Sequence, residues 1–352
     1  MKKTMIAARL HGPWDLRLEE VPIPEPGPYD VLCKVKRAGI CGTDYAIYSG
    51  EFSFVKSGDV HFPLTQGHEW SGVVERVGAL VKNFKAGDRV ISDTNVSCGR
   101  CFACLNGDIT ECKDLRPLGT IHAWDGAFAE YILMPERHVF HLADQISFDD
   151  GAAVEPATIA FSAVRAAEVK PGETVIVHGC GSIGIIAAKL AKIAGASKVF
   201  ITGRTPFKLE CARKFNGADV YISTLEETVE EVLKKELPSG KADKIIETSG
   251  SLELLQQSFY QVRNGGIAAS VAFYEKNLKE LDIDRLIFGN ITFKGVANNA
   301  RTYEPVLNLI ASGALRPAEL ITGRYPFKDI LQGYSDMKEK NSTRIKWILD
   351  FD

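Results

Sequence analysis

Residues 173–203 read ETVIVHGCGSIGIIAAKLAKIAGASKVFITG, and this stretch decides the fold. It opens with a short, almost continuously apolar run, which is typical of a strand buried on both faces. Three closely spaced glycines follow, and after them comes a long apolar pattern that predicts a helix. Residues 197–203 form a second apolar run that predicts another strand. A strand, a helix and a strand in this order indicate a parallel sheet.

The alternation continues toward the C-terminus. Further helices and strands are predicted at 206–219, 242–250, 252–262 and 265–273. We therefore expect an α/β fold with a doubly wound parallel sheet in residues 156–294. Residues 1–155 contain short β-branched runs bounded by glycine and proline, and the alternation loosens again near the C-terminus. A second, β-rich domain is expected from residues 1–155 and 295–352.

Composition excludes several classes of protein. The 352 residues carry a net charge of −3, which gives no electrostatic basis for binding nucleic acid or an anionic membrane. In the first residues, MKKTMIAARLHGPW, the apolar run is too short for that of a signal peptide, and no apolar run in the chain approaches the roughly 20 residues of a membrane span. We expect a soluble cytoplasmic protein with a small-molecule substrate.

The three glycines have G-x-G-x-x-G spacing between a strand and a helix. In this setting the first glycine makes a tight turn, the second lets a pyrophosphate approach the backbone, and the third lets the helix pack on the strand. The positive end of the helix then holds the phosphates. The pattern predicts dinucleotide contacts at Gly179, Gly181, Ser182, Ile183 and Gly184.

The end of the second strand indicates which nicotinamide nucleotide is bound. About 20 residues beyond the glycines, NAD enzymes place an acid that binds the ribose 2′-hydroxyl. Here Gly203 stands in that place, and Arg204, Thr205 and Lys208 follow. No carboxylate repels a 2′-phosphate, and an arginine can bind one, so NADP is favoured over NAD. The alternative is a solvent-facing arginine in a site that accepts both nucleotides.

Four of the eight cysteines lie close together in CGRCFACLNGDITEC. Cys98, Cys101, Cys104 and Cys112 have C-x2-C-x2-C-x7-C spacing, which suits a closed, structural Zn²⁺ site of four thiolates. A ferredoxin-like cluster would continue with C-x3-C-P, and this stretch does not. Disulfides are disfavoured because we expect a cytoplasmic protein, in which thiols stay reduced.

Three other segments carry potential ligands for a second metal ion. These segments are AGICGTD (38–44), QGHEWSG (66–72) and GAAVEPAT (151–158). They supply Cys41, His68, Glu69 and Glu155, and such mixed sulfur, nitrogen and oxygen ligation is typical of a catalytic zinc. Each residue alone has an ordinary structural explanation, so the interpretation depends on their occurrence together with the cysteine-rich stretch and the glycine pattern.

The order of these motifs resembles that of the zinc-containing medium-chain dehydrogenases. Cys-Gly-Thr-Asp, Gly-His-Glu, the four cysteines, a Glu-Pro pair and the glycine pattern follow one another as in that family, over essentially the whole chain. The sorbitol/polyol and threonine dehydrogenase branches are the most similar. The resemblance implies a GroES-like catalytic domain, a Rossmann domain, an active site in the cleft between them, two zinc ions per chain, and a homodimer or homotetramer.

The resemblance also implies roles for single residues. Cys41 and His68 are direct ligands of the catalytic zinc, and Glu69 and Glu155 are carboxylates that bind it directly or through water. Which of the two binds directly stays open at this point. Asp44 matches the acid that orients the zinc-bound imidazole, and Thr43 matches the hydroxyl that relays the proton of the alcohol.

The implied reaction is zinc-dependent hydride transfer between a secondary alcohol and NAD(P), with a polyol, cyclitol, sugar acid or sugar phosphate as substrate. Asn298 and Asn299 stand roughly where sorbitol dehydrogenases carry an Arg-Tyr pair, and Asn95 stands where threonine dehydrogenases carry a histidine. L-threonine or a simple secondary alcohol is the alternative substrate. An NADP(H)-binding redox sensor would lack Cys41 or His68, and a zinc-free quinone reductase would lack the four cysteines.

Overall fold

The computed structural model describes residues 2–121, 124–297, 300–338 and 343–351. The chain divides into two compact units. Unit 1 comprises Met1–Glu155, Asn299–Asn341 and Lys346–Asp352, and unit 2 comprises Pro156–Asn298 and Ser342–Ile345. Within the described ranges, no helix has the length and apolar character needed to cross a membrane.

Unit 2 is built on a six-stranded parallel sheet with the order β13-β12-β11-β14-β15-β16. Its strands are β11 (Thr174–His178), β12 (Lys198–Gly203), β13 (Val220–Ser223), β14 (Ala242–Glu247), β15 (Val262–Ser270) and β16 (Thr292–Gly295). The strand order reverses between β11 and β14. In open parallel sheets the crevice for a ligand lies at such a reversal, beyond the carboxyl ends of the strands.

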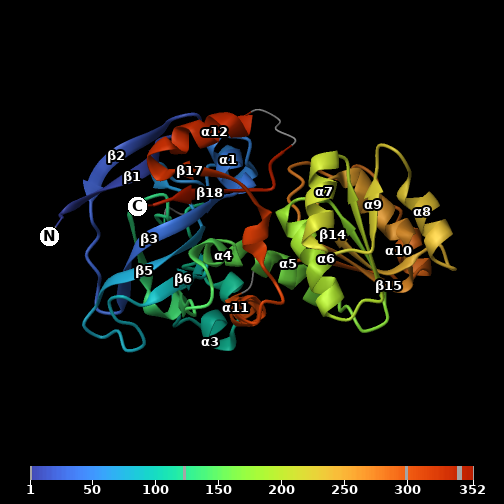
Figure 1. The fold of residues 1–352 in the computed structure, drawn as a ribbon, viewed down its shortest axis with the longest axis horizontal. Helices are drawn as coiled ribbons and strands as arrows, with labels where there is room; N and C mark the ends of the chain where they lie inside the picture. The colour runs from blue at the N-terminus through green and yellow to red at the C-terminus, as the bar shows by residue number, and fades with distance from the viewer. Residues whose placement is uncertain (1, 122–123, 298–299, 339–342, 352) are drawn as a thin grey trace. The chain divides into compact units, whose positions relative to one another are not determined.

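Helices cover this sheet, as Figure 1 shows for α6 and α7 on one side and α9 on the other. They are α6 (Ser182–Ile193), α7 (Pro206–Phe215), α8 (Val229–Glu236), α9 (Leu252–Gln261) and α10 (Ile283–Phe288). The glycine-rich loop therefore joins β11 to α6, and the predicted doubly wound sheet is confirmed.

Three elements of unit 2, one shortened helix and two that were not predicted, differ from the sequence-based expectation. The helix predicted at 206–219 ends at Phe215, because Asn216 adopts a left-handed conformation with φ 52°. Such a residue terminates a helix, and asparagine tolerates the conformation. The sequence analysis also did not identify β13 and α8, although Thr228 and Glu231 form a capping box at the start of α8.

Unit 1 contains a seven-stranded sheet with the order β10-β6-β5-β3-β18-β17, and β9 also pairs with β3. The strands are β3 (Asp30–Ile40), β5 (Glu69–Val77), β6 (Arg89–Ser92), β9 (Tyr131–Pro135), β10 (Val139–His141), β17 (Ile321–Pro326) and β18 (Lys346–Asp350). The C-terminal strand β18 lies between β3 and β17, so the two ends of the chain share one sheet. This arrangement brings C-terminal side chains beside residues of the first 70 positions.

Smaller elements of unit 1 carry the remaining residues of interest. A three-stranded sheet joins β2 (Leu16–Pro22), β1 (Thr4–Leu10) and β4 (Leu64–Thr65), and a hairpin-like pair joins β7 (Asn95–Val96) to β8 (Arg116–Pro117). Short helices α1 (Gly42–Tyr48), α3 (Phe102–Asn106) and α4 (Phe148–Ala152) lie in the N-terminal part, α5 (Val154–Ala166) runs into unit 2, and α11 (Tyr303–Ala311) and α12 (Ile330–Lys338) follow near the C-terminus.

Candidate functional site

A pocket of about 840 Å³ lies in unit 2 at the carboxyl ends of β11 and β12. Of the residues predicted to contact a nucleotide, the pocket is lined by Gly179, Gly181, Gly203, Arg204 and Lys208. The other three predicted contacts belong to the first turn of α6 and are not lining residues: Ser182, Ile183 and Gly184. The structure therefore gathers most of the predicted set around one cavity.

Each glycine of the loop is required for a different local reason. Gly179 has φ 101°, a conformation that side chains rarely adopt. A side chain at Gly184 would overlap the carbonyl oxygen of Gly179, so the helix could not approach the strand. No atom lies within 4 Å of the position that a Cβ of Gly181 would occupy, so its backbone faces open space. That open space is where a phosphate can approach.

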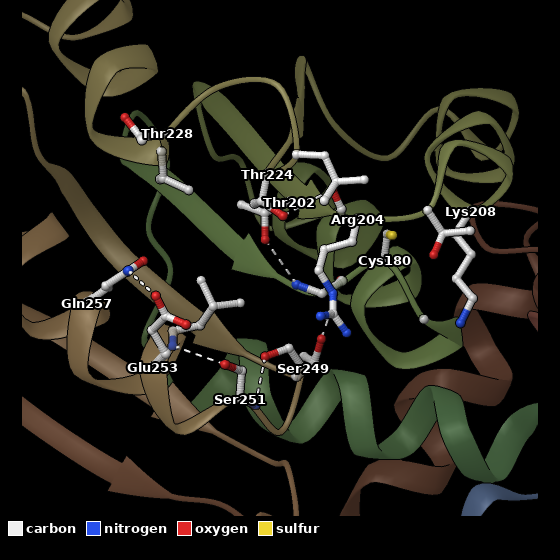
Figure 2. Close-up of a pocket in the computed structure, with 18 of the residues that line it drawn as sticks. Cys180, Thr202, Arg204, Lys208, Thr224, Thr228, Ser249, Ser251, Glu253 and Gln257 are labelled. Carbon is white, nitrogen blue, oxygen red and sulfur yellow. Dashed lines mark hydrogen bonds between the residues drawn. The ribbon is translucent and has the colours of Figure 1, made fainter. Parts of the chain in front are cut away.

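Both cationic and acidic side chains line this pocket. Figure 2 shows Arg204 and Lys208 on one side and Glu253 on the other. Burial is the main cause that lowers the pKa of Lys208, and the charges of Arg344 and Arg204 lower it further. Arg344 therefore adds a third cation near this end of the pocket. The sequence analysis missed it, because no local pattern links position 344 to this loop.

The space beside Gly203 is filled by a cysteine. A Cβ at position 203 would overlap the Sγ atom of Cys180, which is only 5% exposed. Burial raises the pKa of the Cys180 thiol, which favours the neutral form. Cys180 thus occupies the position from which an acidic side chain would extend toward a ribose.

A buried hydrogen-bonded chain supports the glycine-rich loop from below. The backbone N–H of Gly179 donates to Thr202 Oγ1 at 3.3 Å, and Thr202 Oγ1 lies 3.3 Å from Nδ1 of His178. Nε2 of His178 lies 2.8 Å from Oε1 of Gln261. Burial lowers the pKa of His178 to about 4, so the imidazole is neutral.

The buried carboxylate of Glu247 holds the loop after β14, whose residues Thr248 and Ser249 also line the pocket. Glu247, at the end of β14, accepts from the backbone N–H of Ser249 at 2.7 Å and also from the hydroxyls of Ser249 and Tyr274. Thr248 donates from Oγ1 to the carbonyl oxygen of His178 at 2.7 Å. The loop after β14 is therefore fastened both to the strand that carries the glycines and to the segment after β15. The sequence analysis singled out none of these residues.

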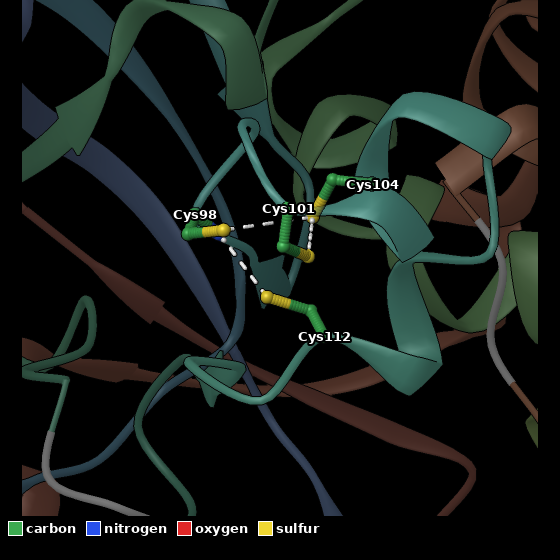
Figure 3. Close-up of side chains that lie close together, drawn as sticks. All are labelled: Cys98, Cys101, Cys104 and Cys112. Atoms are coloured by element: carbon green, nitrogen blue, oxygen red, sulfur yellow. Dashed lines mark hydrogen bonds between the residues drawn. The ribbon is translucent and has the colours of Figure 1, made fainter.

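The four cysteines of the 98–112 stretch converge, as Figure 3 shows. Their Sγ atoms all lie within 4.8 Å of one another, with 3.5 Å between Cys101 and Cys104 and 3.9 Å between Cys98 and Cys104. The backbone N–H groups of Arg100 and Cys101 lower the pKa of Cys98 to about 6. Four sulfur atoms at this spacing fit a closed tetrahedral zinc site.

The second ligand cluster in unit 1 contains Cys41, His68 and Glu69, whose ligand atoms also lie within 4.8 Å of one another. Burial by itself lowers the pKa of His68, but the Asp44 carboxylate and the Cys41 thiol outweigh it, and the pKa lies well above its usual value. Nδ1 of His68 lies 3.4 Å from Oδ1 of Asp44, and neither buried atom has a hydrogen-bond partner within normal distance. This pairing leaves Nε2 as the atom that could bind a metal ion.

Helix α1 brings Cys41, Thr43 and Asp44 together. Cys41 is the N-cap residue, and its backbone N–H donates to Oδ2 of Asp44 at 2.9 Å. Asp44 is completely buried, whereas Thr43 is half-buried on the first turn. The start of α1 thus presents the Cys41 thiol and the Asp44 carboxylate toward His68.

Glu69 is held by a residue that the sequence analysis missed. Lys346, at the start of β18, places Nζ 2.6 and 2.7 Å from the two carboxylate oxygens of Glu69, and both side chains are buried. Glu155, at the start of α5, is the other carboxylate of the region. Burial raises its pKa to about 7, although the charge of His68 acts in the opposite direction. Of the two acids, Glu69 therefore has its oxygens engaged by a buried cation.

Of the three asparagines considered for substrate binding, Asn95 is the one that the structure describes. Asn95 lies in β7, and its backbone N–H donates to Oδ1 of Asp93 at 2.8 Å. Asn298 and Asn299 lie outside the described residues.

Comparison with known proteins gives a consistent result. Residues 27–144 match the family "Alcohol dehydrogenase GroES-like domain", and residues 182–312 match "Zinc-binding dehydrogenase". The chain is 33% identical to sorbitol dehydrogenase of Bacillus subtilis, covering 92% of this chain and 90% of that one. It is 32% identical to L-threonine 3-dehydrogenase of Rhizobium johnstonii, covering 98% of each chain.

A solved structure agrees with these relatives. A zinc-binding dehydrogenase of Sinorhizobium meliloti bound to NADP superimposes with a TM-score of 0.91 at 30% identity, over 99% of this chain and 100% of that one. The chain therefore belongs to the zinc-dependent alcohol and polyol dehydrogenases of the medium-chain family, oxidoreductases that interconvert secondary alcohols and ketones with a nicotinamide nucleotide.

Proposed function

We propose that this protein is an NADP(H)-preferring dehydrogenase of a polyol-type secondary alcohol, with two zinc ions per chain. The residues at the end of β12 are the main support for the cofactor preference. Gly203 offers no carboxylate, Cys180 fills the space beside it, and Arg204 and Lys208 line the pocket next to them. An arginine and a lysine at the strand end where NAD enzymes carry an acid suit a 2′-phosphate.

For the catalytic zinc we propose Cys41, His68 and Glu155 as protein ligands. The contact with Asp44 supports this assignment, because it directs Nδ1 of His68 away from the metal position. Glu69 is assigned a supporting role, since Lys346 engages both of its carboxylate oxygens. When bound there, zinc supplies a Lewis acid that lowers the pKa of an alcohol.

The residues around this position would move and hold the proton. Thr43, on the first turn of α1, offers a hydroxyl that accepts the alcohol proton and passes it on. Asp44 keeps the His68 ring in one orientation through the charge of its carboxylate. Hydride transfer itself belongs to the chemistry of the nicotinamide ring, which the pocket of unit 2 would hold in place.

The second zinc is assigned to Cys98, Cys101, Cys104 and Cys112. Four thiolates leave no open position, so this ion would contribute to folding rather than to the reaction. The convergence of the four sulfur atoms supports the assignment.

The substrate class follows from the relatives and from single positions. The similarity to sorbitol dehydrogenase favours a polyol substrate. Cyclitols, sugar acids and sugar phosphates share the vicinal hydroxyls of a polyol. L-threonine is the second candidate, because a threonine dehydrogenase aligns over nearly the whole chain. Asn95, where those enzymes carry histidine, favours the polyol class.

We also propose that the protein is a cytoplasmic homodimer or homotetramer. Strand β16 is the edge of the six-stranded sheet. Apolar side chains are exposed on it and on α10, including Phe293 at 45%, Ile287 at 65% and Phe288 at 83%. Exposed apolar groups beside an unpaired sheet edge are typical of an interface with another chain.

Steady-state kinetics with both nucleotides test the cofactor proposal. We expect kcat/KM to be higher with NADP, and Arg204→Ala to lower it about 10- to 100-fold with NADP alone, as for the loss of one charged hydrogen bond. A single Gly203→Asp change would clash with Cys180. The informative variant is therefore Cys180→Ala with Gly203→Asp, which should prefer NAD, with Cys180→Ala alone as its control.

Two outcomes would contradict this proposal. One is a wild-type enzyme that prefers NAD. The other is an Arg204→Ala variant that loses no selectivity for NADP.

A panel of polyols, cyclitols, sugar phosphates and amino alcohols, assayed with both nucleotides, tests the substrate class.

The Thr43→Val variant tests the proton path. This substitution keeps the shape of the side chain and removes the hydroxyl. We expect kcat to fall about 10²-fold, the usual scale for a lost proton-transfer group. An unchanged kcat in Thr43→Val would eliminate Thr43 as the relay.

A further inference from the structure

A chain of buried hydrogen bonds runs from α12 to α1 in unit 1. The hydroxyl of Tyr334 donates to Oε1 of Gln66 at 2.8 Å, and Nε2 of Gln66 donates to the backbone carbonyl of Asp44 at 2.9 Å. Gln66 and Asp44 are 0% exposed, and Tyr334 is 1% exposed. Two buried side chains and a buried backbone carbonyl are thus linked away from solvent.

The chemistry of the groups fixes the direction of each bond. A backbone carbonyl only accepts, so the Gln66 amide must present Nε2 to Asp44. Oε1 then faces Tyr334, and an amide oxygen only accepts, so the tyrosine must donate. The arrangement leaves one orientation for each group, which makes the link specific.

An apolar environment surrounds this link. The ring of Tyr334 packs edge-on against Tyr48 at 4.9 Å and against Phe128 at 6.4 Å, and all three belong to or border the apolar core of unit 1. A leucine and a phenylalanine could fill much of the same space without needing any partner. Polar groups in such a place are costly unless fully paired, so the pair calls for an explanation beyond packing.

The explanation lies in what the link joins. Gln66 precedes His68 by two positions, and the Asp44 carbonyl that it binds belongs to the turn that begins at Cys41. The Asp44 carboxylate in turn contacts both the Cys41 backbone and His68. Gln66 therefore connects the segment of one candidate zinc ligand to the segment of the other, and Tyr334 holds Gln66 in the required orientation.

We propose that Gln66 and Tyr334 are positioning residues that set the spacing between Cys41 and His68 for the catalytic zinc. The inference rests on the proposed zinc site at those two residues. Groups that orient metal ligands from outside typically change metal affinity about 10- to 100-fold when removed. Gln66 acts one bond further out, so an effect near the lower end of that range is expected.

The test separates positioning from packing by comparing single and double variants. Tyr334→Phe leaves Oε1 of Gln66 buried without its donor, and it should lower Tm and speed zinc release. Gln66→Leu with Tyr334→Phe removes both polar partners, and such paired apolar replacement is close to neutral for stability. We expect the double variant to regain Tm and still release zinc from the catalytic site about tenfold faster than wild type.

Zinc release is followed with a chromogenic chelator on the zinc-loaded protein, beside Tm and kcat. Tyr325→Phe is the chemical control, since it removes a hydroxyl bonded to Asp336 at 2.7 Å in the same unit. Ile330→Val calibrates the effect of lowered stability alone, because Ile330 is a fully buried apolar residue of α12. Release from the double variant that exceeds release from both controls supports the proposal.

Release no faster than in the controls would overturn it and leave Gln66 and Tyr334 as core residues. His68→Ala distinguishes this failure from failure of the proposed function. If His68→Ala holds as much zinc as wild type, the assignment of the catalytic site is wrong, and the positioning role falls with it. If His68→Ala loses one zinc ion while the double variant behaves as wild type, only the positioning role is wrong.

Discussion

Unit 1 contains two buried aspartate–histidine pairs with the same spacing. Nδ1 of His68 lies 3.4 Å from Asp44, and Nδ1 of His138 lies 3.4 Å from Asp93. All four side chains are at most 8% exposed. In the distance between imidazole and carboxylate and in their burial, the two pairs are equivalent.

The other ring nitrogen makes them different. Nε2 of His138 accepts the backbone N–H of Ser97 at 3.1 Å, so its lone pair is already used. His68 instead lies beside the Cys41 thiol and Glu69 within one ligand cluster. An aspartate faces one ring nitrogen of the histidine in both pairs, and the groups around the other ring nitrogen distinguish the candidate metal ligand from the structural histidine.

A third buried histidine extends the comparison to unit 2. His178 has an amide, Gln261, in place of an aspartate, and no ion pair involving it occurs among the described residues. Without a carboxylate, burial dominates and lowers the pKa of His178 to about 4. The partner of a buried imidazole therefore sets its charge as well as its orientation.

The largest expected effect separates the first two pairs. His68→Ala should lower kcat by more than about 10³-fold, since losing a ligand removes more than the roughly 10- to 100-fold effect of an outer partner. Nucleotide binding should persist, because the lining residues of the nucleotide pocket all belong to unit 2. His138→Ala should lower Tm and retain most of kcat in the folded, zinc-loaded protein. Equal losses of kcat in the two variants would break the comparison.

A smaller effect is expected for the aspartates. Asp44→Asn keeps the shape of the side chain and removes the charge that faces His68, and we expect zinc affinity at the catalytic site to fall about 10- to 100-fold. Asp93→Asn is the matched control, and it should leave that affinity unchanged. Competition with a chelator of known affinity measures both. A larger loss in Asp93→Asn would show that the wrong pair was assigned to the metal.

The sequence predicted the parts of the molecule whose residues are close together along the chain. The glycine-rich loop, the four cysteines and the Cys41–Asp44 turn each lie within a single short segment, and the confirmed α/β fold depends on strands and helices with strong local patterns. The roles of the individual site residues stay predictions. Asn216 shows the limit of local patterns, because its left-handed conformation ends α7 before the apolar periodicity does.

Contacts between distant segments were not predictable in this way. Lys346 reaches Glu69 only because β18 pairs with β3, and Tyr334 reaches Gln66 from α12 near the end of the chain. The overlap between Cys180 and a side chain at Gly203 depends on how two adjacent strands place their loops. Such contacts follow from the register of the sheet, and a single sequence carries no direct signal for it.

The remaining effect bears on stability rather than on activity or metal binding, and it concerns the neutral histidine of unit 2. The folded pKa of His178 is about 4, below the value of 6.5 expected for an unfolded chain. Between these values the unfolded state binds more protons than the folded state, so stability rises with pH. The contribution is fully present above pH 6.5 and is lost as the pH falls toward 4. Over that range the loss is about 3 kcal/mol.

His178→Gln removes the titrating group and keeps a side chain that can hydrogen-bond. Urea unfolding between pH 7 and pH 4.5 should therefore show a shallower pH dependence in the variant than in wild type. Far-UV circular dichroism is the suitable probe, because the four tryptophans, Trp14, Trp70, Trp124 and Trp347, all belong to unit 1. The exposed His141→Gln is the matched control. If the two variants have the same pH dependence as wild type, the pKa of His178 is the same in the folded and unfolded states, and an amide partner does not keep the imidazole neutral.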